Sequence, residues 1–107
     1  MQILFYSDRV RREIEAWPDG LYADFLYRIS LVEQAGRVLA APWSKALGEG
    51  LFEFRCRSQD GIARAFYCTV KGDKLILLHG YIKKTQKAPP QELDVARRRL
   101  KEVKVHG

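Results

Sequence analysis

The sequence predicts an α+β fold, in which a strand and two helices precede an antiparallel meander of three strands and a closing helix (β-α-α-β-β-β-α). The chain has 107 residues, of which 47% are hydrophobic, so residues 1–107 are expected to form a single domain that can bury a modest core. Apolar residues recur at helical spacing up to residue 36 and again after residue 89, whereas residues 51–82 largely alternate and contain glycine turns. These patterns predict a meander packed against helices.

The first third of the chain has the pattern of a scaffold. Residues 2–6 are apolar and aromatic and predict a short strand, and Ser7 or Asp8 can cap the helix that follows. That helix ends at Pro18, and a second one runs from there to Gly36. Apolar residues at helical spacing predict the buried faces: Val10, Ile14 and Trp17 in the first helix, and Leu21, Phe25, Ile29 and Val32 in the second.

A connection over residues 37–50, which contains Pro42, Gly48 and Gly50, leads to two strands that the turn signal Asp60-Gly61 joins into a hairpin. The first strand spans about residues 51–57 and the second about residues 62–70. The first strand alternates, with Phe52, Phe54 and Cys56 on one face and Leu51, Glu53, Arg55 and Arg57 on the other. One face is therefore expected in the core and the other in solvent.

The loop length decides which arginines share a face. If Asp60 and Gly61 form a two-residue turn, Arg57 lies opposite Arg64 and Arg55 opposite Phe66, so three arginines share the polar face. Like charges directly opposite each other destabilise a sheet, and such a face makes sense where an anion binds. A three-residue loop would instead send Arg64 to the other face. Sequence alone leaves both registers open.

A third strand is expected over about residues 74–82, after the Gly72-Asp73 turn. The pattern places Leu75, Leu77, His79 and Tyr81 on one face and Ile76, Leu78, Gly80 and Ile82 on the other. Both faces are apolar at first. The end of this strand is polar and basic instead, because His79 is followed by an aromatic residue and then by Lys83, Lys84 and Lys87.

Pro89-Pro90 begins the closing helix at the favoured first positions. Its buried stripe is Leu93, Ala96, Leu100 and Val103, and its remaining faces carry Arg97, Arg98, Arg99, Lys101 and Lys104. A basic face of this kind is usually only solvated, but it can also lie along ribosomal RNA.

The charge of the chain is concentrated in its second half. Residues 1–50 contain 6 Lys/Arg and 7 Asp/Glu, whereas residues 51–107 contain 13 and 6. Clustering of the basic residues on the predicted strands favours a nucleic acid as the partner.

Several functional classes find no support in the sequence. Cys56 and Cys68 are the two cysteines of the chain, which has no secretory signal, and their spacing is not that of a zinc site. Both are therefore expected to be small apolar core residues. No apolar run is long enough to cross a membrane, and the start of the chain does not have the form of a signal peptide, which together predict a cytoplasmic protein. No phosphate loop or metal-ligand cluster is present, and no cofactor is expected.

Three motifs in residues 51–99 together resemble a known family. They are Glu53-x-Arg55, then Arg64-x-x-Tyr67, then Leu-His79-Gly-aromatic-x-Lys83-Lys84. This set is similar to the HigB branch of the RelE-like toxins, in particular to a small phage-derived group. The resemblance implies the RelE-like α+β fold and the toxin of a type II toxin–antitoxin system. It implies a metal-independent endoribonuclease that cleaves messenger RNA on the ribosome and inhibits translation, and a companion antitoxin, a helix-turn-helix protein of the HigA type.

The chemistry implied is transesterification within the RNA, in which a ribose 2′-hydroxyl loses a proton and attacks the adjacent phosphorus. Arg55 and Arg64 are the candidates for holding the phosphoryl oxygens, since a guanidinium donates a fixed fork of N–H groups. His79 can act as acid or base, and Lys84 and Tyr67 are further candidates for proton transfer or charge support. The residues expected to contact RNA outside the reaction centre are Arg57, Tyr81, Lys83, Lys87, Arg97 and Arg98.

Two alternatives to a ribonuclease stay open. The chain can be an RNA-binding module that makes no cuts, or a relative of the same fold directed at gyrase, because a fold does not determine an activity. Gyrase-directed relatives generally lack the basic set, so Arg55, Arg64 and Lys84 argue against that alternative.

Overall fold

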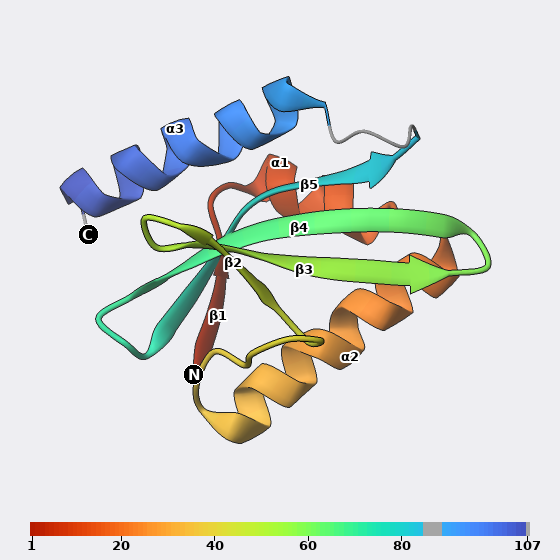
Figure 1. The fold of residues 1–107 in the computed structure, drawn as a ribbon, viewed down its shortest axis with the longest axis horizontal. Helices are drawn as coiled ribbons and strands as arrows, with labels where there is room; N and C mark the ends of the chain where they lie inside the picture. Colours follow the sequence, from red (N-terminus) through yellow and green to blue (C-terminus); the bar gives the residue numbers. More distant parts are fainter. Residues whose placement is uncertain (85–88, 107) are drawn as a thin grey trace.

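A five-stranded mixed sheet lies between two layers of helices in the computed structural model, which describes residues 1–84 and 89–106 (Figure 1). The elements in chain order are β1 (Gln2–Phe5), α1 (Asp8–Glu15), α2 (Asp19–Ala35), β2 (Lys45–Gly48), β3 (Leu51–Ser58), β4 (Gly61–Val70), β5 (Lys74–Lys83) and α3 (Pro90–His106). The strand order is β1-β5-β4-β3-β2. Among the described strands, only the β1 and β5 pair is parallel. The predicted α+β class is thus confirmed.

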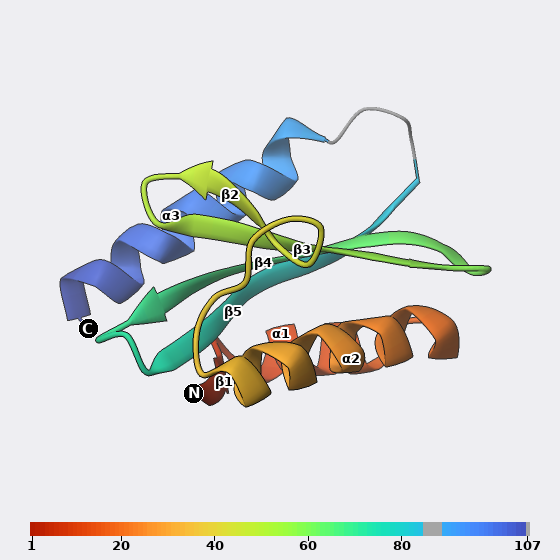
Figure 2. The ribbon, with the colours of Figure 1, turned by 60° about the horizontal axis from the view of Figure 1, so that its bottom comes forward.

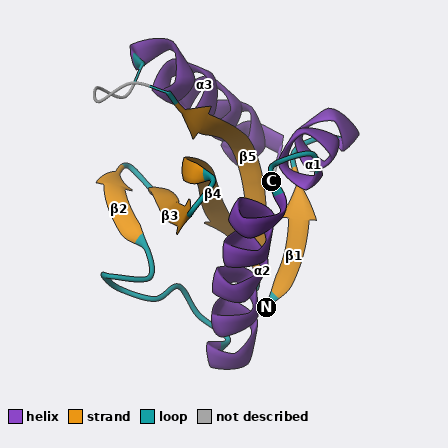
Figure 3. Ribbon diagram, turned by 90° about the vertical axis from the view of Figure 1, so that its right-hand side faces the viewer, coloured by secondary structure: helices purple, strands orange, loops and turns teal. Residues whose placement is uncertain are grey.

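The two helical layers enclose two separate cores (Figures 2 and 3). Helices α1 and α2 cover one face of the sheet with the predicted stripes that include Ile14, Leu21 and Phe25. Helix α3 covers the other face, where Ala96 and Leu100 pack on Phe66, Cys68 and Leu78 of the sheet. Both cysteines are buried without a disulfide, in agreement with the prediction that they are core residues.

The ends of the first two helices follow local signals in the sequence. The Ser7 hydroxyl accepts a hydrogen bond from the backbone N–H of Val10 at 3.2 Å and caps α1. Gly36 ends α2 with a φ of 68°, a left-handed conformation that a glycine adopts without steric cost. These two signals are the ones that predicted the boundaries.

Strand β2 was not predicted, since residues 37–50 were expected to be a connection only. It pairs with the first part of β3, so that Lys45 lies opposite Glu53 and Ala46 opposite Phe52. Four residues with the sequence Lys-Ala-Leu-Gly have no alternating pattern to reveal a strand. The free edge of β3 provides their hydrogen-bond partners.

The predicted alternation of β5 is wrong beyond Leu78, because a β-bulge interrupts the pairing of β4 with β5 between Phe66 and Tyr67. Leu78 packs in the α3 core and the next residue, His79, bonds to α3 as well. An added Cβ at Gly80 would lie 2.8 Å from the Ile14 side chain, so Gly80 faces α1. The extra residue of the bulge therefore reverses the face to which each later side chain of β5 points.

Candidate functional site

The β3–β4 hairpin places Arg55 directly opposite Arg64. The turn consists of Gln59 and Asp60, since Ser58 is already paired with Gly61, so the predicted pairing is wrong by two residues. A shift of two keeps every side chain on its face, so Arg55, Arg57 and Arg64 share one face, as they would with the two-residue turn.

A tertiary contact accounts for the shifted turn. The Asp60 carboxylate accepts a hydrogen bond from the backbone N–H of Gly20 at 3.1 Å, at the first turn of α2. The Ser58 hydroxyl accepts another from the backbone N–H of Asp60 at 2.9 Å. A Cβ on Gly20 would lie 2.8 Å from Asp60, so the glycine permits this approach. The hairpin tip is therefore docked on α2.

The face that carries the arginines is the α3 side of the sheet. Side chains of β3, β4 and β5 form a pocket there of about 220 Å³, which we call the arginine pocket. The N-terminal part of α3 closes one side of it. Its lining residues are Leu47, Glu53, Arg55, Arg64, Phe66, Tyr81, Lys83, Pro89 and Leu93.

Glu53 is the acidic residue of this pocket, and its side chain is only 8% exposed. Its carboxylate accepts a hydrogen bond at 2.8 Å from the Nε atom of Arg55, which is about half exposed. A buried carboxylate is costly unless it is paired in this way. Sequence reasoning included Glu53 in a motif but gave it no role, although a glutamate among the arginines of one face was a usable signal.

Aromatic rings form the apolar part of the site. Phe66 and Tyr81 lie nearly parallel with centroids 5.9 Å apart, and the His79 ring lies 6.4 Å from Phe66 and 6.3 Å from Tyr81. Burial raises the pKa of the Tyr81 hydroxyl, and the nearby Glu53 acts in the same direction while Arg64 opposes both. Tyr81 therefore stays a neutral phenol at neutral pH.

His79 is engaged with α3 and is absent from the lining of the pocket. Its Nε2 atom forms a hydrogen bond with the carboxylate of Glu92, in the first turn of α3. Its Nδ1 atom is buried and has no partner among the described residues. The hydrogen bond to Glu92 therefore ties the His79 ring to α3.

Tyr67 lies on the opposite face of the sheet, so the structure does not bring it together with Arg55 and Arg64. It is fully buried in the core below α1 and α2, where its ring stacks on Phe54 with centroids 4.3 Å apart. Its hydroxyl shares a hydrogen bond with Ser44, and burial raises its pKa to about 12. Tyr67 is three positions from Arg64 along a strand, an odd separation that reverses the face.

The basic residues predicted at the end of β5 and on α3 separate into three groups. Lys83 lines the arginine pocket, whereas Lys84 is exposed beyond the end of β5, and Lys87 lies outside the described residues. Arg97 contacts the β2–β3 turn, where it donates a hydrogen bond to the carbonyl of Leu47 at 3.3 Å and lies 3.7 Å from the Glu49 carboxylate. Arg98 is exposed.

Metal and membrane signals are both missing from residues 1–84 and 89–106. No group of three or more His, Cys, Asp or Glu side chains there is arranged to hold a metal ion. None of the helices in that part of the chain is long and apolar enough to span a bilayer.

Comparison with known proteins gives one family. A search of curated proteins finds no match to this chain. The model of the family described as "Phage derived protein Gp49-like (DUF891)" matches residues 12–101, which include all of β2 to β5 and most of α3. The chain therefore belongs to the Gp49-like family of phage-derived proteins, which is part of the RelE/HigB-like toxin superfamily.

Proposed function

We propose that this protein is the toxin of a type II toxin–antitoxin system and that it cleaves messenger RNA on the ribosome without a metal. The observation that carries the proposal is the placement of Arg55 and Arg64 directly opposite each other, beside the buried carboxylate of Glu53. Like charges directly opposite each other in a sheet repel each other unless an anion lies between them. An RNA phosphate between Arg55 and Arg64 would be bound by both side chains, which would also stabilise the charge of the transition state.

The residues of the arginine pocket can supply each step of the transesterification. Glu53 takes the proton of the ribose 2′-hydroxyl, whose oxygen then attacks the adjacent phosphorus. Arg55 and Arg64 stabilise the charge that develops on the phosphoryl oxygens. Lys83 gives a proton to the departing 5′ oxygen. The products are a 2′,3′-cyclic phosphate and a 5′-hydroxyl end, so every proton and bond is accounted for.

The aromatic residues of the pocket have a separate role in the proposal. Phe66 is nearly buried and Tyr81 partly open, so Tyr81 can present its ring to a nucleobase. Base stacking on an aromatic ring is the common way of holding single-stranded RNA. In this proposal His79 positions α3 through Glu92 instead of transferring a proton.

The exposed cationic face also implies a partner that covers it. We propose that the cognate antitoxin, a helix-turn-helix protein of the HigA type, neutralises the arginine pocket or the neighbouring part of α3. Co-expression from the native operon followed by purification of the toxin tests this. Recovery of the protein alone, without toxicity to the cell, would contradict it.

The deciding experiment is controlled expression without an antitoxin, with RNA 5′ ends mapped across the transcriptome and product termini identified chemically. The proposal expects growth arrest, cuts within translated messages, and cyclic-phosphate ends. Growth arrest with intact messages and altered DNA supercoiling would support the gyrase-directed alternative. Salt-sensitive binding of RNA with no cleavage, on ribosomes or off them, would support the non-cleaving RNA-binding module.

A further inference from the structure

A second and larger hollow adjoins the arginine pocket at the outer edge of β3. It measures about 580 Å³, and we call it the edge pocket. Arg55 and Arg64 line both hollows, so these two side chains stand at the boundary between them. The other residues of the edge pocket are Arg28, Ala41, Pro42, Ser44, Lys45, Cys56 and Arg57.

The edge pocket exists because β2 is shorter than β3. Strand β2 pairs with residues 51–53 only, and no described strand pairs with the outer edge of β3 beyond Glu53. The chain preceding β2 and the side of α2 border the space that a longer strand would fill. Pro42 and Arg28 belong to these two borders.

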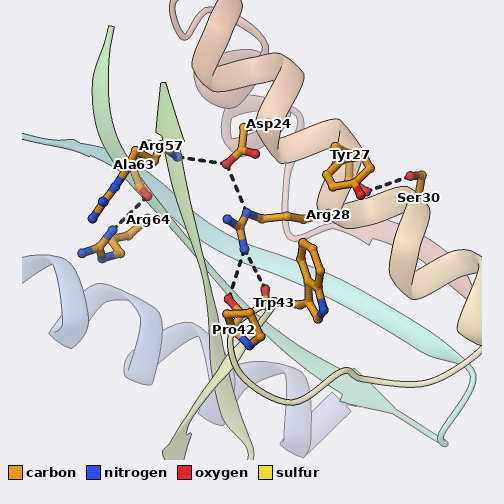
Figure 4. A network of polar contacts seen from close by, with 9 residues as sticks. All are labelled: Asp24, Tyr27, Arg28, Ser30, Pro42, Trp43, Arg57, Ala63 and Arg64. Carbon is orange, nitrogen blue, oxygen red and sulfur yellow. Dashed lines mark hydrogen bonds and ion pairs between the residues drawn. The ribbon is translucent and has the colours of Figure 1, made fainter. Parts of the chain in front are cut away.

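Arg28 is held in a fixed orientation at this border. Its Nε atom donates to the Asp24 carboxylate at 3.1 Å, and its Nη1 atom donates to the carbonyl of Trp43 at 3.1 Å. Its side chain is only 14% exposed. The remaining nitrogen, Nη2, has no hydrogen-bond partner among the described residues, and Figure 4 shows it on the side of Arg57 and Arg64.

The two hollows differ in chemistry. Five of the nine residues that line the edge pocket are basic, and none of the nine is acidic or aromatic. Asp24 lies close by, but its Oδ2 atom already accepts from Arg28 and from the backbone N–H of Arg57 at 2.9 Å. The arginine pocket, by contrast, contains Glu53 and the aromatic rings. One hollow is suited to a nucleobase and a reacting phosphate, and the other to phosphate alone.

We propose that the edge pocket is a second RNA subsite, which binds the sugar-phosphate backbone of the nucleotide next to the one in the arginine pocket. This inference rests on the proposed function. The phosphate that joins the two nucleotides lies between Arg55 and Arg64, and the next phosphate lies against Arg28, Lys45 and Arg57. The RNA strand therefore crosses the edge of the sheet instead of running along the groove beside α3.

The test uses RNA oligonucleotides with a 2′-deoxyribose at the cleavage position, which keeps them intact. A dinucleotide and versions extended at either the 5′ or the 3′ end are titrated into the protein and followed by NMR at several salt concentrations. The variants are Lys45→Gln and Arg57→Gln, whose side chains are exposed and line only the edge pocket. Lys101→Gln removes one exposed charge from α3 and is the matched control. Arg28 is left unchanged because it also holds the chain before β2.

The wild-type protein should bind one of the two extended RNAs several-fold more tightly than the dinucleotide. Lys45→Gln and Arg57→Gln should each remove most of this gain and lower the salt-dependence slope by about 0.7, the value for one phosphate contact on a single strand. Binding of the dinucleotide and all binding by Lys101→Gln should be unaffected. Equal losses for the dinucleotide and the extended RNA, or no loss, or no binding of RNA by the wild type, would overturn the subsite.

Failure of this inference and failure of the proposed function give different results. Ribosome-dependent cleavage together with unchanged RNA binding by Lys45→Gln and Arg57→Gln leaves the nuclease intact and removes the subsite. The expected length dependence with no cleavage under any condition supports the subsite and contradicts the nuclease.

Discussion

Arg64→Ala is expected to abolish cleavage and leave the protein as stable as before. The only hydrogen bond that the structure records for the Arg64 side chain, among the described residues, is a long one of 3.4 Å to the carbonyl of Ala63. Losing it should change the free energy of unfolding by no more than about 0.5 kcal/mol. Relief of the repulsion from Arg55, directly opposite, contributes about 0.2–1 kcal/mol in the other direction. The melting temperature should therefore stay constant or rise slightly.

The kinetic effect should be much larger than the effect on stability. Removing one donor that faces the developing charge of a transition state costs about 2.7–4 kcal/mol, or a factor of about 100–1,000 in rate. Single-turnover cleavage of messenger RNA on programmed ribosomes measures it, with a thermal melt of the same preparation. Arg98→Ala, which removes an exposed charge on α3, is the control; it should only weaken association with RNA and should cleave at nearly the wild-type single-turnover rate once the ribosomes are saturated with protein.

Two outcomes would refute the reasoning about Arg64. Cleavage by Arg64→Ala at close to the wild-type rate would show that the guanidinium does not face the reacting phosphate. Loss of activity with a large drop in melting temperature would show that Arg64 is a structural residue. In the second case, the proposed advantage of an anion between Arg55 and Arg64 would have no support.

Three further outcomes are expected from the cores. Tyr67→Phe should destabilise the fold by about 1–2 kcal/mol in chemical denaturation, because the buried hydroxyl of Ser44 loses its partner. Cleavage should be unchanged, and a loss of cleavage without a loss of stability would show that Tyr67 takes part in the reaction. Gly80→Ala should cost about 1–3 kcal/mol by overpacking, since the new Cβ would lie 2.8 Å from Ile14, and an unaltered melting temperature would contradict the bulged register of β5. Burial raises the pKa of the Cys56 thiol from 9.0 to about 12, so its contribution to stability is complete below pH 9 and is lost as the pH rises toward 12. Its alkylation should therefore follow global unfolding, and rapid alkylation of the folded protein would show that it is accessible.

The order of the predicted elements came from local patterns, which also reduced the arginine face to two possible registers. The apolar stripes of the first two helices, with Ile14 in α1 and Leu21 and Phe25 in α2, predicted the core that these helices form with the sheet, because an amphipathic helix buries one face. The hairpin signal at Asp60-Gly61 left two registers open. The observed register puts Arg55 and Arg64 on the same face, as a two-residue Asp60-Gly61 turn also would, since a difference of two residues in register does not move a side chain across the sheet. Their roles in catalysis stay predictions.

Other features depended on contacts between segments far apart in the sequence. Strand β2 forms because the edge of β3 offers it hydrogen bonds, and the hairpin turn shifts because Asp60 binds the start of α2. The bulge in β5 turns His79 toward α3, where it pairs with Glu92. Side-chain periodicity in a strand reports a face only while the pairing is regular, so one extra residue reverses every later position. The sequence by itself therefore determined the helices and the strands β1, β3, β4 and β5, and it left two registers open for the arginine face. Only the tertiary structure decided between these registers, and only it decided which of Tyr67, His79, Lys83 and Glu53 join that face in the pocket.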